Sequence, residues 1–209
     1  YVNPLQFGAG EDLDKYPKPF EDDTKLCELE GVDIIFHPTN LYPDHGIQIG
    51  LHANSLSSTL CGASRPGHFD GVVTVVNILF NIIQPNIAIF GEKDFQQLSI
   101  IRRMVSDLYM PVSIIEANTV READGLAKSS RNRYLTTEQR QQASAIPACL
   151  HFIQQAAGQG LALTQCIQTG LAHLDTHDIQ VDYLQICSER TLEPVTTLDS
   201  TEPLRIFIA

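Results

Sequence analysis

The turn from Gly91 to Gln97 carries the residue types that bind a phosphate group. Gly91 lets the backbone approach a ligand closely, and a helix that begins after the turn presents free N–H groups at its N-terminus. Lys93 adds a full positive charge. The alternative is an ordinary charged turn in which Asp94 caps the helix. Taken by itself, the segment leaves both interpretations open, because turns between a strand and a helix commonly carry such residues.

A second candidate segment runs from Lys128 to Arg133 and brings two hydroxyl groups close to a guanidinium group. Ser129, Ser130 and Arg131 are the residue types that surround triphosphate oxygens with charge-assisted hydrogen bonds. A solvated basic loop is the simpler explanation, and this segment alone favours it.

Two glutamines, Gln6 and Gln97, are expected at the ends of strands or in the turns that follow them. An amide both donates and accepts hydrogen bonds, which suits a substrate with hydroxyl groups and a carboxylate. Considered alone, each fits a surface glutamine better. Arg65 and His68 place a cation and an imidazole in a long irregular segment, where the alternative is a turn whose His68 caps the following helix.

The spacing of apolar residues predicts the elements that position these side chains. Helices are expected over 20–29, 71–83 and 98–108, and strands over 33–36, 87–90 and 112–115, with Tyr1 and Val2 ending a strand and 47–52 extended. The run at 87–90 has no polar interruption, which predicts a parallel strand covered on both faces, and the strand at 112–115 is expected to be buried too. Because strands and helices alternate, a parallel α/β sheet is predicted, with ligands at the carboxyl ends of its strands.

Beyond about Asn118 the pattern changes to that of a small α+β domain. Thr136 and Gln139 form a capping box for a helix that is predicted to run to about Ala157 and to be kinked or broken at Pro147. A further helix is predicted over 164–174, and strands over 179–187 and 204–208 are expected to pair.

Charge and composition exclude several classes of protein. The 209 residues carry a formal net charge of -11, so the overall field repels nucleic acids and anionic membranes. The five cysteines are never spaced as Cys-x-x-Cys, and His173 and His177 lack companion ligands, so no metal site is predicted. With no apolar run long enough for a bilayer and no signal peptide, a cytoplasmic protein is expected.

Several segments, each weak alone, together resemble the pantothenate synthetase (pantoate–β-alanine ligase) family. They are residues 2–8, 12–17, 65–69, 90–98, 120–127 and 129–132. From Tyr1 to about Leu135 the resemblance rests on sequence motifs specific to the family. Beyond that point it continues as a similar layout of helices and strands.

This resemblance implies a fold and a reaction. The fold would be a Rossmann-like nucleotidylyltransferase α/β sheet over 1–118, binding ATP and pantoate, with a small α+β lid domain over 119–209 and assembly as a homodimer. The reaction would be ATP-dependent: the pantoate carboxylate attacks the α-phosphate to give pantoyl adenylate and pyrophosphate, and β-alanine then displaces AMP. Mg2+ would bridge the phosphates.

The resemblance also assigns site residues by their positions in the motifs. The implied ATP contacts are Gly91, Glu92, Lys93, Asp94, Val120, Lys128, Ser129, Ser130 and Arg131, of which Lys93, Ser129, Ser130 and Arg131 would be catalytic. The implied pantoate ligands are Gln6 and Gln97, with Gln6 also near β-alanine and with Asn3, Arg65 and His68 around them.

Two features keep alternatives open. The family's His-x-Gly-His motif belongs to a segment before Tyr1, and the abrupt start and end of the chain suggest that both ends of a longer protein are absent. Lys128 stands where the family usually has Leu or Met, so its side chain either contacts a phosphate or, as we favour, points to solvent while its backbone serves the nucleotide. The alternative functions are a non-catalytic nucleotide- and pantoate-binding dimerisation module, or another carboxylate-adenylating ligase of this fold.

Overall fold

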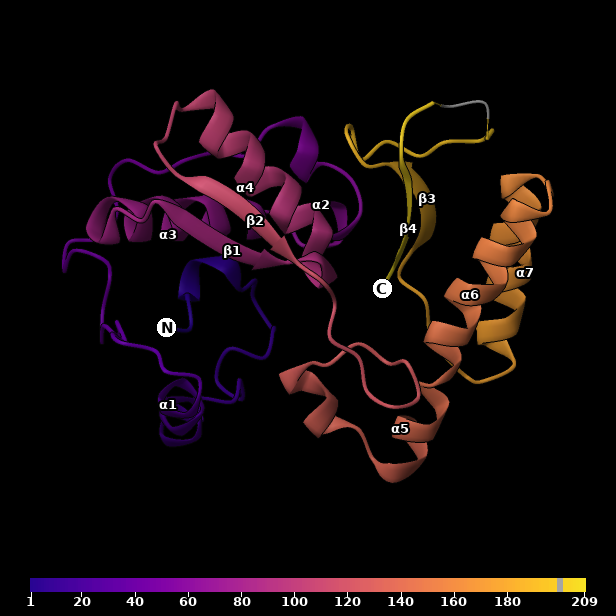
Figure 1. Ribbon diagram of the computed structural model, residues 1–209, viewed down its shortest axis with the longest axis horizontal. Coiled ribbons are helices and arrows are strands. Elements are labelled where there is room, and N and C mark those ends of the chain that lie inside the picture. The colour runs from indigo at the N-terminus through magenta and orange to yellow at the C-terminus, as the bar shows by residue number, and fades with distance from the viewer. Residues whose placement is uncertain (199–200) are drawn as a thin grey trace.

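The computed structural model describes residues 1–198 and 201–209, and Figure 1 shows their arrangement. The α-helices are α1 (Phe20–Leu29), α2 (Cys61–Ser64), α3 (His68–Ile83), α4 (Phe95–Asp107), α5 (Thr137–Gln142), α6 (Ala145–Gly158) and α7 (Leu163–Asp175). The strands are β1 (Ile87–Gly91), β2 (Ser113–Ala117), β3 (Leu184–Ser188) and β4 (Leu204–Ile208). Short 3-10 helices lie in the connections: η1 (Pro4–Gln6), η2 (Ser55–Ser57), η3 (Glu92–Asp94) and η4 (Ser130–Tyr134).

The first part of the chain is built on the parallel pair β1 and β2. Their register runs from Ile87 opposite Ser113 to Gly91 opposite Ala117, so both strands end at the same edge. On the apolar face predicted for α3, Val72, Val75 and Val76 are buried and pack with α4, while Ile83 at the end of the helix is 53% exposed. Phe90 and Ile114 face the same core. The predicted parallel α/β arrangement is therefore confirmed, with η3 leading from the end of β1 directly into α4.

The prediction that both strands are covered on two faces is wrong for the described residues. Ile89 is 66% exposed, and Ile87 and Ile115 are about half exposed. Side chains alternate across a strand, so Phe90 and Ile114 point to the helices while these three isoleucines point to the opposite face. An uninterrupted apolar run indicates that both faces of a strand are apolar. It does not indicate that other elements pack on both faces.

Other local expectations also differ from the structure. Residues 33–36 and 47–52 are irregular, because the described residues place no strand beside them to complete their hydrogen bonds, and Tyr1 and Val2 lie outside any strand. The predicted long helix is interrupted at Ala143 and Ser144, before Pro147. Pro147 falls in the first turn of α6, where a missing N–H costs little.

The second part of the chain has its own core between α6, α7 and the antiparallel pair β3 and β4. The capping box predicted at Thr136 and Gln139 is present at the start of α5. A further buried cluster joins the two parts: Phe95 and Leu98 of α4 pack with Cys187 of β3 and Phe207 of β4. Figure 1 shows this strand pair lying beside the α2 and α4 end of the first part.

Candidate active site

Gln6 is the last residue of η1, near the start of the chain, so the prediction that Gln6 follows a strand is wrong. The buried Asn3 caps η1: its Oδ1 accepts hydrogen bonds from the Leu5 N–H, at 3.2 Å, and from the Tyr42 hydroxyl. Its Nδ2 donates to Gln6 Oε1 at 3.1 Å and to the Gly71 carbonyl at 3.0 Å. Because this carbonyl end of the Gln6 amide is engaged, its Nε2 group, which has no partner among the described residues, presents two donors to a ligand.

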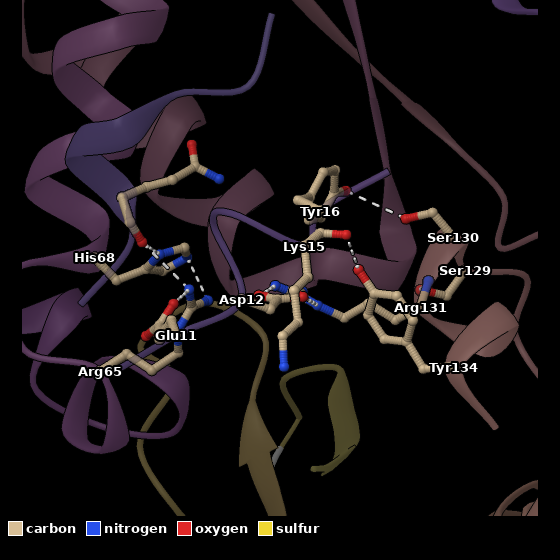
Figure 2. Close-up of polar contacts among 11 residues, drawn as sticks. Glu11, Asp12, Lys15, Tyr16, Arg65, His68, Ser129, Ser130, Arg131 and Tyr134 are labelled. Atoms are coloured by element: carbon tan, nitrogen blue, oxygen red, sulfur yellow. Dashed lines mark hydrogen bonds and ion pairs between the residues drawn. The ribbon is translucent and has the colours of Figure 1, made fainter. Parts of the chain in front are cut away.

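Arg65 and His68 hold the backbone of Gln6. The Arg65 Nε donates to Glu11 Oε1 at 2.9 Å, its Nη2 donates to the other Glu11 oxygen and to the Gln6 carbonyl, and its Nη1 lies 3.2 Å from His68 Nε2. His68 Nδ1 lies 2.8 Å from the same Gln6 carbonyl. Arg65, His68 and Glu11 lie together on the left of Figure 2. The Arg65 hydrogen bonds keep the pKa of Glu11 below its usual range, so the pair stays ionised.

The same contacts fix the protonation state of His68. Arg65 can only donate, so Nε2 of His68 must accept and Nδ1 must carry the proton that is donated to Gln6. Burial lowers the pKa of His68, and the Arg65 charge lowers it further, while Asp94 acts in the opposite direction. His68 is therefore neutral, and the 91–94 turn lies within electrostatic reach of it.

A depressed His68 pKa predicts that the protein loses stability in mild acid. The unfolded chain takes up a proton near pH 6.5 and the folded chain does not, so stability is complete above that pH and falls below it. One such group contributes a slope of at most about 1.4 kcal/mol per pH unit. Urea unfolding at several pH values should show that the free energy of unfolding depends less steeply on pH in His68→Asn than in the parent protein. A His68 pKa at or above 6.5, measured by NMR, would contradict the prediction.

Ser129, Ser130 and Arg131 lie together across the site from this group, as the right of Figure 2 shows. Ser129 Oγ accepts the Arg131 backbone N–H at 3.2 Å and so caps η4. The Arg131 guanidinium makes two hydrogen bonds to the carboxylate of Asp12, from Nε at 2.9 Å and from Nη2 at 2.8 Å, and it lies 5.4 Å from the centre of the Tyr16 ring. Ser130 donates to the Tyr16 hydroxyl at 3.3 Å.

The turn after β1 presents Lys93 to solvent. Lys93 Nζ is 3.3 Å from Asp94 Oδ1, and both side chains are substantially exposed, so the pair is weak and the ammonium group remains accessible. Asp94 occupies the N-cap position of α4 but makes no capping hydrogen bond with its side chain. Glu92 points elsewhere and pairs with Arg205 of β4 at 3.2 Å.

The two adjacent glutamines of α4 have different surroundings. Gln96 is buried, and its Nε2 donates to the carbonyls of Leu56 and Thr59 at 2.9 and 2.8 Å. Gln97 is half-buried in the first turn of α4, and its side chain has no partner among the described residues. Gln96 thus ties α4 to residues 56–59, while Gln97 keeps its amide available for a ligand.

Val120 and Lys128 lie side by side at the base of a short hairpin. The Lys128 N–H donates to the Val120 carbonyl at 2.9 Å, and the Lys128 side chain is exposed. The hairpin follows β2, so it starts from the same sheet edge as the 91–94 turn.

Sequence reasoning missed the segment that connects the groups. Residues 11–16, which we name the strap, contact Arg65 through Glu11, Arg131 through Asp12, and Ser130 through Tyr16. The segment 12–17 is among the motifs that carry the resemblance, but the motifs alone give none of its residues a role. Its partners lie 54 and 119 residues away in the sequence, and spacing gives no signal at such separations.

Two hollows in the described surface, of about 480 and 1100 Å3, lie elsewhere. The first is lined by several residues between His52 and Asp70, and the second by residues of 51–59, α4 and 189–203 together with Val73. Arg65 is the one predicted site residue that lines either hollow. The candidate site lies between η1, the 91–94 turn, η4 and the strap, and the first hollow borders it at Arg65. Within the described residues no cluster of three or more His, Cys, Asp or Glu side chains suits a metal ion, and no helix could span a bilayer.

A parallel strand pair that ends in a glycine turn and leads into a helix, with further loops meeting at the same edge, is the arrangement of Rossmann-like α/β proteins that bind ligands there. The comparisons with known proteins are more specific. The family model described as pantoate-beta-alanine ligase matches residues 1–209, so the chain belongs to the pantoate-beta-alanine ligase family.

Relatives and solved structures agree with this assignment. The chain is 48% identical over 214 residues to a pantothenate synthetase of Syntrophotalea carbinolica, covering all of this chain and 75% of that protein. It is 49% identical over 203 residues to the Pseudomonas entomophila pantothenate synthetase, covering 95% and 71%. A Thermus thermophilus crystal structure of the same name superposes with a TM-score of 0.93 at 41% identity, covering 100% and 77%. A Francisella tularensis ligase, complexed with beta-gamma ATP and beta-alanine, gives 0.76 at 28% identity and the same coverage.

Proposed function

We propose that this chain catalyses the ATP-dependent condensation of pantoate with β-alanine through a pantoyl adenylate, releasing pyrophosphate and then AMP. The observation that carries the proposal is the family match along residues 1–209. The Francisella tularensis ligase is complexed with beta-gamma ATP and beta-alanine, which supports the same two substrates here. A non-catalytic binding module and a different adenylating ligase are less well supported, because the relatives bear the name of this enzyme.

Both chemical steps use nucleophiles that the substrates bring, so the chain needs no covalent nucleophile. Its task is to position the reactants and to neutralise phosphate charge. In our proposal Lys93 and Arg131 supply the positive charges, and Ser129 and Ser130 supply hydroxyl and backbone donors. Gly91, Glu92, Asp94, Val120 and Lys128 frame the nucleotide through their backbone and turn geometry.

Pantoate is assigned to the amides of Gln6 and Gln97. The Nε2 group of Gln6 and the whole amide of Gln97 have no partner among the described residues, so both can bind hydroxyl and carboxylate oxygens. Arg65 and His68 act on the pantoate side of the site indirectly, since both hold the Gln6 carbonyl, and Asn3 orients the Gln6 amide.

Magnesium fits this site as an ion carried by the nucleotide. Mg2+ bound to a nucleotide usually takes phosphate oxygens, waters and one or two carboxylates, and the largely exposed Asp94 is the carboxylate closest to Lys93 in the turn. When bound, the ion would offset negative charge on the phosphates.

We further propose a homodimer in the cytoplasm, with residues 1–118 as the ATP- and pantoate-binding domain and 119–209 as the lid domain. The separate core of α6, α7, β3 and β4 supports that division.

The function is tested by assaying the protein as it is encoded. AMP release should require pantoate, β-alanine and ATP together, while pantoate and ATP alone should give pyrophosphate in a single turnover. Nucleotide binding without turnover would favour the non-catalytic module, and turnover with another carboxylate in place of pantoate would favour a different ligase.

Gln97→Ala should weaken pantoate binding and leave ATP binding nearly intact. A substrate oxygen that loses its hydrogen bond in a desolvated site costs about 1 to 3 kcal/mol, or roughly one to two orders of magnitude in affinity. Calorimetry with each ligand separately measures the effect, and Gln84→Ala at the exposed end of α3 provides a control. Equal losses for both ligands would indicate a structural role for Gln97.

A further inference from the structure

The strap is held to both sides of the candidate site by adjacent carboxylates. Glu11 pairs with Arg65, whose guanidinium also contacts Gln6 and His68 on the pantoate side. The next residue, Asp12, pairs with Arg131 on the nucleotide side. Figure 2 shows the two arginines approaching the strap from opposite directions.

The Asp12 contact has the geometry of a specific pair. It is bidentate, with two N···O distances of 2.9 and 2.8 Å, and the Asp12 side chain is 25% exposed. Such parallel hydrogen bonds fix the plane of a guanidinium group as well as its position. The Tyr16 ring beside the guanidinium and the hydrogen bond from the Tyr134 hydroxyl to the Lys15 carbonyl, at 3.0 Å, hold the strap and η4 together around it.

The pair leaves Arg131 able to bind a second anion. A guanidinium group has five N–H donors, and Asp12 takes one from Nε and one from Nη2. The Nη1 group and the second Nη2 hydrogen remain on the edge that does not face Asp12. A carboxylate on one edge and a phosphate on the other are therefore compatible, so Asp12 need not be displaced when a nucleotide binds.

We propose that Asp12 is a positioning residue for the nucleotide site, which holds the Arg131 guanidinium in the orientation that receives a phosphate of ATP. This inference rests on the proposed function, because it takes Arg131 to be an ATP contact. Holding a long side chain in place before the ligand arrives removes an entropic cost of binding and secures its alignment during adenylation. The strap then links the nucleotide side to the pantoate side through consecutive residues.

The test compares Asp12→Asn with Asp14→Asn, which alters an exposed carboxylate of the same strap. Asp12→Asn should lower kcat/KM for ATP by about tenfold to a hundredfold, as expected for a misaligned catalytic group, with a smaller change in the KM for pantoate. Calorimetry should show weaker ATP binding. Asp12→Glu should recover part of the loss, Asp14→Asn should match the parent protein, and thermal melting should show that each variant folds.

A double-mutant cycle separates this inference from the function on which it rests. If Asp12 acts through Arg131, Asp12→Asn should cause little further loss in a protein that already carries Arg131→Ala. Tighter ATP binding by Asp12→Asn would mean that the carboxylate competes with phosphate, which overturns the proposal. Equal behaviour of the Asp12 and Asp14 variants would also overturn it. Unchanged ATP use by Arg131→Ala would instead contradict the proposed nucleotide site itself.

Discussion

Lys93→Ala should slow formation of the pantoyl adenylate by two to three orders of magnitude. The ammonium group projects from the turn after β1, at the sheet edge where the triphosphate is proposed to bind. Among the described residues its one ion pair is the weak contact with Asp94. Removing one preorganised donor that stabilises developing charge costs about 3 to 4 kcal/mol of barrier. Rapid-quench measurement of pyrophosphate release in a single turnover, with saturating ATP and pantoate, reports this step directly.

The folded protein should tolerate the same change. The Lys93 side chain is 40% exposed, and an exposed ion pair contributes between zero and about 1 kcal/mol to stability. Lys25→Ala is a matched control, since Lys25 is an exposed lysine of α1 that also pairs with one aspartate. An unchanged adenylation rate in Lys93→Ala would remove the central charge from the proposed mechanism.

The elements whose shape depends on neighbouring residues could be predicted from the sequence. The spacing of Val72, Val75 and Val76 places one face of α3 toward the core, and the structure buries that face. The capping box at Thr136 and Gln139 is a contact over three residues, and it forms as predicted. In each case the interaction is encoded within one or two helical turns, where sequence spacing determines geometry.

The features that depend on distant parts of the chain could not be predicted in this way. The exposure of Ile89 depends on what packs against the sheet, and its neighbours in sequence carry no information about that. The same holds for Arg131, which the sequence suggests as a free phosphate ligand and which the structure pairs with Asp12. The motifs supply the identities of the proposed site residues, while the hydrogen-bond partners of these residues require the fold.

A close contact between backbones links the stability of the fold to the site. An ideal Cβ on Gly71 would lie 2.3 Å from the Leu5 carbonyl oxygen and 2.7 Å from the Gln6 nitrogen, far inside van der Waals contact. Here α3 packs directly on η1, and Asn3 bonds to the Gly71 carbonyl across the same contact. Glycine is needed at this position for lack of space, since its backbone is ordinary α-helix.

Gly71→Ala should therefore destabilise the protein. The clash alone should cost about 3 kcal/mol of folding free energy, at the upper end of the usual cost of overpacking, because backbone atoms cannot rotate away as a side chain can. This loss should exceed the gain of about 1 kcal/mol that alanine brings to a helix. The matched control is Gly158→Ala at the end of α6, where a Cβ meets nothing within 4 Å and the helical gain should appear alone. Urea unfolding of both variants measures the difference.

The same substitution should affect the ligands unequally in whatever fraction of the protein remains folded. Relief of the clash must move η1 away from α3, which displaces the Gln6 amide and breaks the Asn3 contact that orients it. Pantoate affinity should then fall by more than ATP affinity, since Lys93 and Arg131 belong to other segments. If Gly71→Ala proved as stable as the parent protein and bound pantoate normally, η1 would be free to shift without consequence, and the assignment of Gln6 to the substrate would lose its structural basis.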